Sequence, residues 1–315
     1  MGGVRRHELR FGLLGPPVLY DVDSGTGDLY GTGTSRDTDT GTRDTDTADA
    51  PVTPHLKPVG SPKVRALLAA LLLEAGRVVS VESLKDALWG GAPPASAQAS
   101  LHNHVARLRR LLDDPERLRA VPPGYVLRVE QGELDVHVFE RHVAAARGAH
   151  ITHNWEGVVR EGAAALALWR GTPLSGLPAE LGGYAFVQRL EEARLLLLEW
   201  RYDAGLAVGG ARLDGLVPEL AALTAEHPLR EAYHRQLMLA LHRTGRQAEA
   251  LAVHRDLRAR LVEELGVEPG RLVREAHAEV LQGTRAPVRP PAAVGGEREG
   301  EREDKDQAVT GTKPG

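Results

Sequence analysis

Residues 96–112 place hydroxyl, amide and guanidinium groups along one side of a predicted helix. At 100° per residue, the large apolar side chains fall in a narrow stripe that would face a core: Leu101, Val105, Leu108 and Leu112. The opposite side is small and polar at Ser100 and Asn103, then cationic at Arg107 and Arg110. An amide can pair bidentately with adenine, a guanidinium with guanine, and further arginines can meet phosphates. The pattern indicates a helix that reads bases in a major groove.

Other candidate contacts lie beside this face. His104 and Arg109 flank it on opposite edges, and Lys63 and Arg65 stand near the start of an earlier predicted helix, where they could touch backbone phosphate. Tyr125, in a Pro-Gly-Tyr turn, is expected to pack beneath a hairpin, with DNA contact as the second interpretation. The alternative for the arginines is that they complement the helix dipole and keep the surface hydrated.

The charge of the whole chain conceals a basic segment. The 315 residues carry 39 basic and 43 acidic side chains, a net charge of −4. Residues 57–130 alone hold 11 basic and 7 acidic side chains, whereas residues 131–283 hold 17 and 21. Only local charge attracts a phosphate, because the screening length in physiological salt is about 8 Å. The overall charge therefore does not exclude a nucleic acid partner.

The elements around the predicted reading helix are typical of a helix-turn-helix with a wing. Ser61 followed by a proline marks one helix start, Gly76 ends that helix, and Ser80 caps the next. Two short strands around a Pro-Pro-Gly turn form a hairpin. The expected order is helix, strand, helix, helix and hairpin, at residues 62–75, 77–80, 81–89, 96–112 and 118–129.

The N-terminal segment combines short strands with an unusual insertion. Residues 9–20 predict short strands around a Gly-Pro turn. Residues 24–54 hold nine Thr, six Asp and five Gly, too little apolar surface to offset the entropy of ordering, so we expect disorder there. A calcium loop is the alternative, because Asp37 and Asp39 have ligand spacing, but Ala48 stands where such a loop needs glutamate.

The rest of the chain is predicted to be helical. Apolar stripes with a helical period recur from 136 to 282, and the pair 229–244 and 246–265, joined at Gly245, resembles a tetratricopeptide-like unit. Residues 284–315 are rich in Pro, Gly, Glu and Arg, which predicts a disordered tail. The expected fold is mainly α, with a winged helix-turn-helix domain over 1–130 and an all-α helical domain over 131–283.

Several long motifs resemble one known family. Residues 67–110, ending in DALWGGAPPASAQASLHNHVARLRR, and the later PPGYVLRV resemble the OmpR-type winged helix of the actinobacterial antibiotic regulatory proteins, the SARP family. The segments ALALWRGTPL and HPLREAYHRQLMLALHRTGRQAEALAVHRDLRARLVEELGVEPG resemble that family's bacterial transcriptional activation domain. The resemblance covers about 240 of the 315 residues, namely most of 9–20 and 56–282.

The resemblance implies an activator of a secondary-metabolite gene cluster. It implies binding to direct repeats in double-stranded DNA near the promoter −35 region, self-association on that DNA, and recruitment of RNA polymerase through its sigma factor and its α or β subunits. It places base reading on Asn103, Arg107 and Arg109; the helical wheel favours Arg110 over Arg109, so both are kept. It also implies a cytoplasmic protein at the nucleoid, without a cofactor. No apolar run reaches about 18 residues, so a membrane span is not expected either.

The sequence departs from the family pattern in two places. The insertion at 24–54 interrupts what is usually a short strand connection, which leaves the N-terminal sheet open. The reading helix has His102-Asn103-His104 where Gln or Thr is commoner at the first two positions, so the recognised bases are expected to differ.

Other classes of function are weakly supported by the residues. Cysteine is absent, HExxH and GxSxG motifs are missing, and His102 and His104 point about 160° apart on a helix, so neither catalysis nor a metal site is expected. Three alternatives stay open: a repressor with the same domains, a helical scaffold whose winged helix has lost DNA binding, and a regulator that holds a small molecule among aromatic residues of the helical domain, namely Trp155, Trp169, Trp200, Tyr202 and Tyr233.

Overall fold

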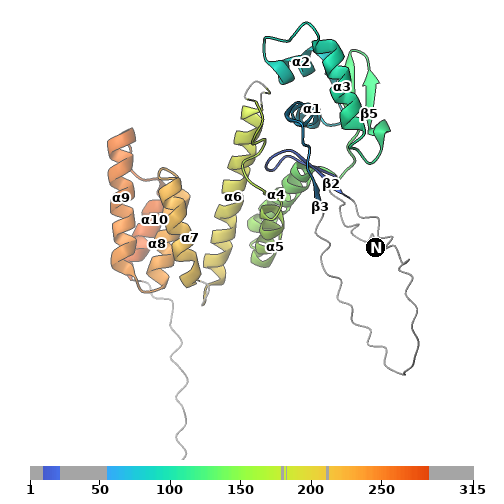
Figure 1. The fold of residues 1–315 in the computed structure, drawn as a ribbon. Helices are drawn as coiled ribbons and strands as arrows, with labels where there is room; N and C mark the ends of the chain where they lie inside the picture. The colour runs from blue at the N-terminus through green and yellow to red at the C-terminus, as the bar shows by residue number, and fades with distance from the viewer. Residues whose placement is uncertain (1–9, 22–54, 179–180, 182, 211–212, 284–315) are drawn as a thin grey trace, which may run out of the picture.

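The computed structural model describes residues 10–21, 55–178, 181, 183–210 and 213–283. Over this part of the chain, short strands and a winged helix-turn-helix precede a series of long helices (Figure 1). The predicted fold class, mainly α with a mixed N-terminal part, is confirmed. No helix among these residues is long and apolar enough to cross a membrane.

The N-terminal sheet continues across the insertion. Its strands are β1 (Phe11–Gly12), β2 (Val18–Asp21) and β3 (His55–Lys57), in that order in the sheet. β2 and β3 pair antiparallel, with Leu19 opposite Lys57. The segment that was predicted to be disordered, 24–54, and its calcium alternative lie outside the described residues. The strands on either side of it nevertheless pair as neighbours, which answers the open question about this sheet.

The winged helix forms from the expected local signals. Pro62 begins the first helix, and the Ser61 carbonyl accepts a hydrogen bond from the Arg65 N–H, although the Ser61 hydroxyl makes no cap. The Ser80 hydroxyl caps the second helix by accepting from the Ser83 N–H at 3.0 Å. The elements are α1 (Pro62–Leu73), β4 (Val78–Ser80), α2 (Val81–Trp89), α3 (Ala97–Arg109), the 3₁₀ turn η1 (Pro115–Arg117), β5 (Leu118–Val121) and β6 (Gly124–Leu127).

The structure shortens one predicted helix of the winged helix and explains why its hairpin needs a glycine. The predicted helix 96–112 is shorter in the structure, because α3 ends at Arg109 and Leu111 donates its N–H to the Leu108 carbonyl, three residues back, as in a tightened last turn. The hairpin requires Gly124, since a Cβ there would lie 1.8 Å from the Val79 carbonyl oxygen of β4. Strands β4, β6 and β5 form one antiparallel sheet in that order.

The part of the chain from Asp135 to Gln282 is built from helices, in agreement with the apolar stripes in its sequence. Its helices are α4 (Asp135–Ile151), α5 (Trp155–Leu166), α6 (Tyr184–Val208), α7 (Leu213–Glu226), α8 (Glu231–Arg243), α9 (Gln247–Leu265) and α10 (Arg271–Gln282). The predicted pair of helices joined at Gly245 is α8 and α9, and Gly245 supplies the left-handed backbone of the turn, with φ of 81°. The predicted tail, 284–315, lies outside the described residues.

Two hydrophobic cores share one long helix. The first core runs from Phe11 to Leu197 and joins the N-terminal sheet, the winged helix and the first half of the helical part. The second core runs from Tyr202 to Val280 and packs α7–α10 on the end of α6. Figure 1 shows α6 standing between the two bodies. The first core therefore crosses residue 130, where the sequence predicts a domain boundary, and the division between the cores lies within α6.

A buried carboxylate connects the N-terminal sheet to the helical part. Asp135, at the start of α4, is fully buried and accepts hydrogen bonds from the backbone N–H groups of Leu13 and Leu14 at 2.8 to 3.0 Å. The guanidinium of Arg170, beyond α5, donates to the same carboxylate at 3.2 Å. Segments more than 120 residues apart in sequence are thus tied together at one side chain.

Candidate nucleic-acid interface

Helix α3 presents the predicted reading face to the outside. Leu101, Val105 and Leu108 are buried in the first core, which fixes the opposite side of the helix outward. Asn103 and Arg107 are exposed, and neither side chain makes a hydrogen bond or an ion pair within the described residues. Their amide and guanidinium groups therefore remain available to an outside partner, as base reading requires.

Two further predicted residues border this face. Arg110 is exposed at the end of α3, and its Nε makes only a long 3.4 Å hydrogen bond to the Ala106 carbonyl. Ser100 is half-buried, one turn before Asn103 and two turns before Arg107. Arg110 thus matches the wheel's preference for an exposed cation, while Ser100 lies lower on the side of the helix.

Arg109 is directed toward the wing. Its Nε donates a 2.9 Å hydrogen bond to the Leu118 carbonyl of β5, and the side chain is half-buried. This bond ties the end of α3 to the first strand of the hairpin. The Arg109 side chain therefore has a partner in the wing, and the base-reading role that the family resemblance implies for it stays a prediction.

Lys63 and His104 both lie against the ring of Trp89, a residue that was not among the predicted contacts. The Lys63 ammonium donates to the Leu88 carbonyl and lies 5.6 Å from the centre of the Trp89 ring. The His104 ring lies 6.3 Å from the same ring. Burial, and secondarily the charges of Arg107 and Lys63, lower the pKa of His104 below its usual range. His104 is therefore neutral at physiological pH.

Arg65 and Tyr125 also have protein partners. The Arg65 Nε donates to the Val59 carbonyl at 3.3 Å, and its side chain is half-buried. Tyr125 is only 8% exposed and belongs to the first core, so packing beneath the hairpin, its first interpretation, agrees with the structure. Neither residue is exposed, and their contacts with DNA stay a prediction.

Some exposed polar side chains near the reading face were not among the predicted DNA contacts. Gln98 is exposed in the first turn of α3 and shares a 3.1 Å hydrogen bond with His102, one turn later. Arg119 is exposed on β5, beside the hairpin. The four-residue spacing of Gln98 and His102 was a visible signal for a pair on one helix edge. No comparable pattern marked Arg119, because its direction depends on the register of the hairpin.

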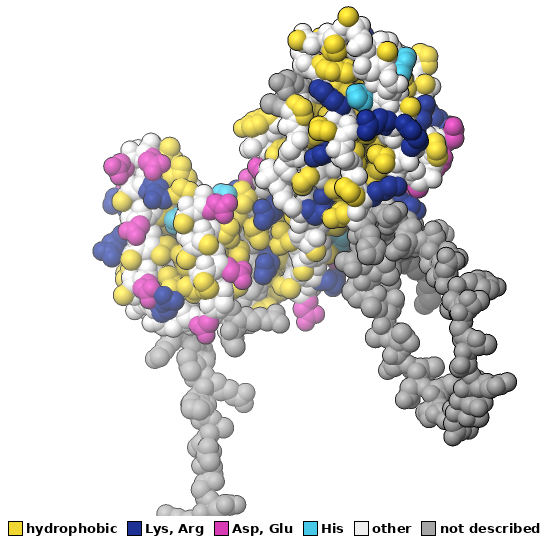
Figure 2. Space-filling view, viewed as in Figure 1, with side chains coloured by type: hydrophobic (Ala, Val, Ile, Leu, Met, Phe, Trp, Pro, Cys, Tyr) yellow, Lys and Arg dark blue, Asp and Glu magenta, His cyan; other side chains and the backbone are white. Residues whose placement is uncertain are grey.

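Positive charge gathers over the winged helix, although part of it is neutralised within the protein. Figure 2 shows Lys and Arg side chains concentrated on the upper body, where α1–α3 and β5 lie. Arg117, counted with the basic segment, is 7% exposed and forms paired hydrogen bonds of 2.7 and 2.8 Å with Glu133, with Asp113 at 2.9 Å. Charge counting therefore overstates the cations that can meet DNA.

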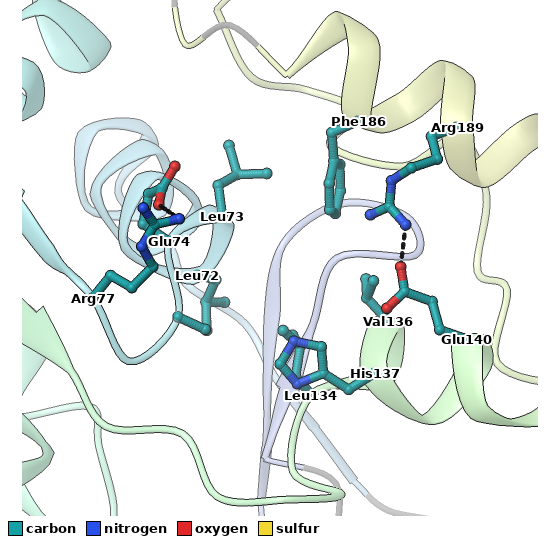
Figure 3. A pocket seen from close by; sticks show the side chains of 11 residues that line it. Leu72, Leu73, Glu74, Arg77, Leu134, Val136, His137, Glu140, Phe186 and Arg189 are labelled. Carbon is teal, nitrogen blue, oxygen red and sulfur yellow. Dashed lines mark hydrogen bonds and ion pairs between the residues drawn. The ribbon is translucent and has the colours of Figure 1, made fainter.

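The aromatic residues proposed for a ligand pocket are divided among packed sites. Tyr202 and Tyr233 are buried in the second core, and Trp169 packs edge-on against Phe139 at 5.4 Å. A cavity of about 180 Å³ lies elsewhere, between the end of α1 and the starts of α4 and α6, where Phe186 lies beside Arg189 (Figure 3). A more open hollow of about 430 Å³ lies beside residues 129–132 and His137, and none of the five aromatic residues lines either space. In the described part of the chain, no three His, Asp or Glu side chains gather as a metal site would require.

Comparison with known proteins gives matches over both parts of the chain. Residues 58–127 match the family described as transcriptional regulatory protein, C terminal, and residues 134–281 match the bacterial transcriptional activator domain. The regulatory protein DnrI of Streptomyces peucetius is 40% identical over 227 residues, covering 69% of this chain and 83% of DnrI. The regulatory protein AfsR of Streptomyces coelicolor is 45% identical over 230 residues, but this chain spans only 22% of its length.

A solved structure shares the same arrangement. Mycobacterium tuberculosis EmbR, in complex with a low affinity phosphopeptide, is similar over 87% of this chain and 65% of its own, with a TM-score of 0.67 and 32% identity. Two family matches in the expected order, a relative similar over most of its length and a shared fold all agree with the motifs in the sequence. The chain therefore belongs to the SARP family of transcriptional regulators, with a winged DNA-binding helix-turn-helix followed by a bacterial transcriptional activator domain.

Proposed function

We propose that this regulator is a sequence-specific activator of a secondary-metabolite gene cluster, with α3 as its reading helix. The observation that carries the proposal is the exposed, unpartnered face of α3, where Asn103 and Arg107 lie one turn apart and β5 and β6 form a wing beside them. Arg110 extends the face toward backbone phosphate. An amide and a guanidinium at this spacing suit two neighbouring bases of one major groove.

Membership of the family leads us to propose also that the protein binds direct repeats in double-stranded DNA near a promoter −35 region. Copies that follow one another head to tail would place α3 on the same side of the duplex once per helical turn, so the repeats would be spaced by about one turn. Self-association on DNA then follows from the spacing of the repeats.

The helical part has a surface suited to a protein partner, and we assign it to RNA polymerase, through the sigma factor and the α or β subunits. Large exposed apolar side chains follow one another along the chain from the end of α9 to the start of α10: Val262, Leu265, Val267 and Leu272. Exposed apolar side chains that lie together mark interaction surfaces.

The proposal is tested by selecting duplexes from a random library with the wild-type chain and measuring affinity for the selected sequence. Replacing Arg107 with Ala should weaken binding by about 1–3 kcal/mol, the value of a bidentate base contact. Arg258→Ala, in α9 and paired with Glu268, serves as the control and should leave affinity unchanged. If Arg107→Ala binds as tightly as the wild type, its base-reading role is wrong.

Activation is tested in cells with a reporter behind the selected sequence. Deleting the gene should lower reporter output if the protein activates, whereas a rise would identify a repressor. A chain that selects no duplex at all would favour the scaffold alternative, in which the winged helix has lost DNA binding.

A further inference from the structure

Trp89 stands where the three helices of the winged helix meet. It is the last residue of α2, and its half-buried ring packs on the first core. Lys63 approaches the ring from the first turn of α1, and His104 approaches it from the middle of α3. Figure 1 shows α1, α2 and α3 grouped in this body. One ring thus links each helix of the motif to the other two.

The contacts of Lys63 hold the ring from the α1 side. Its ammonium donates to the Leu88 carbonyl, next to Trp89 in the chain, while it lies 5.6 Å from the ring centre. A cation at that distance over an indole is attracted by the ring's negative face. The charge of Lys63 is therefore engaged within the protein, at the junction of α1 and α2.

The contact of His104 connects the ring to the reading face. The His104 and Trp89 rings are tilted by 35° with centres 6.3 Å apart. His104 follows Asn103 directly and precedes Arg107 by three residues, so its contact with Trp89 lies on the same stretch of helix as both reading side chains. The other end of α3 is held separately, through the bond from Arg109 to the Leu118 carbonyl.

We propose that Trp89 is a positioning residue that sets how α3 lies in the major groove, and that Lys63 and His104 act through this ring and not by touching DNA. This inference rests on the proposed DNA-binding function of α3. A shift of the helix away from its optimal depth loosens base contacts, which need fixed geometry, and leaves phosphate contacts largely intact. Trp89 therefore controls the preference for one sequence over another.

The test compares two probes: the duplex selected by the wild-type chain and a random-sequence duplex of equal length. Trp89→Ala should weaken binding to the selected duplex about tenfold or more, the loss of at least one base contact, with little change on the random duplex. Trp89→Phe, which keeps a ring, should recover most of that loss. Circular dichroism and thermal unfolding show whether each variant folds.

Lys63→Met provides a second route that does not depend on removing the ring. It should lower affinity for the selected duplex by about three- to tenfold, as the loss of a cation–π contact implies, with the salt dependence unchanged. A phosphate contact would instead reduce the slope of log affinity against log salt by about one on both duplexes. Arg258→Met, a charge removal in α9 away from the winged helix, should alter neither quantity.

Three outcomes separate the ideas. A wild-type chain that prefers no sequence removes the proposed function and this inference together. A wild-type chain with a preference that Trp89→Ala and Lys63→Met, both folded, fully retain overturns the positioning role alone. A reduced salt slope in Lys63→Met also overturns it, because Lys63 would then contact phosphate directly. If Trp89→Ala does not fold, Lys63→Met and Trp89→Phe still decide the matter.

Discussion

The reading face of α3 and the junction at the start of α4 use the same kinds of side chain in opposite ways. At the reading face, Asn103 and Arg107 are exposed and have no partner in the described part of the chain. At the junction, Asp135 and Arg117 are buried, and every contact they make is with the protein. A polar or charged side chain is available to recognise DNA only where it has no hydrogen-bond partner in the protein. Where it has such partners, as at Asp135 and Arg117, it holds segments of the fold together.

The largest expected effect is the loss of stability when the buried carboxylate of Asp135 is removed. Replacing Asp135 with Ala leaves the backbone N–H groups of Leu13 and Leu14, and the guanidinium of Arg170, without their acceptor. We expect the free energy of unfolding to fall by about 3–5 kcal/mol, as when one partner of a buried ionic contact is removed. Urea denaturation measures it. Asp256→Ala, an exposed site on α9, should change stability by less than about 0.5 kcal/mol.

A smaller loss of stability is expected when Arg117 is replaced. Arg117→Met keeps the aliphatic stem but removes the guanidinium that joins Glu133 and Asp113. Glu133 still accepts the Glu130 N–H at 2.7 Å, so we expect a loss of about 2–4 kcal/mol, below the full cost of an uncompensated buried charge. Denaturation is again the measurement. A variant as stable as the wild type would show that this network does not hold the wing to α4.

At the reading face, substitution should change recognition and leave stability intact. Asn103→Ala should cost about 1–3 kcal/mol of affinity for the selected duplex, and the base preference should relax at one position of the site. The free energy of unfolding should change by less than about 0.5 kcal/mol, because the side chain is exposed and has no partner. A uniform loss of affinity over all sequences would instead assign Asn103 to the DNA backbone.

The smallest expected effect is a pH dependence from His104. Its pKa in the folded protein is lowered, so below the unfolded value of about 6.5 the unfolded chain binds a proton that the folded chain resists. Lowering the pH from 7 toward 5 should therefore destabilise the wild type slightly more than His104→Gln. Chemical denaturation at both pH values gives the difference. Equal losses in the two proteins would show that His104 titrates normally.

The sequence was sufficient to predict the order of the helices and of the hairpin, because each of these had its own local signal. It did not predict strand β3, which is defined by its pairing with β2. The apolar stripes of the helices, the cap at Ser80 and the Pro-Pro-Gly turn all depend on neighbours close in the chain. The exposure of Asn103 and Arg107 was equally accessible, since a helical wheel separates the buried from the outer side.

The sequence was insufficient wherever a side chain's partner belongs to another element. Lys63 was selected for its place near a helix start, and Arg109 was selected by the family resemblance. Neither signal could predict the carbonyl groups of Leu88 and Leu118 that these side chains bind. Asp135 counted only as one acidic residue, although it accepts hydrogen bonds from backbone more than 120 positions away. The sequence also did not predict that one core would cross residue 130, because the members of that core belong to elements far apart in the chain.

The salt dependence of affinity for the selected duplex tests the central claim most directly. If the winged helix neutralises phosphates while α3 reads bases, log affinity should fall linearly and steeply as log salt rises, with a slope close to the number of phosphates contacted. The selected duplex should also stay preferred over a random one at every salt concentration. A flat dependence, or equal affinity for both duplexes, would contradict DNA reading by α3.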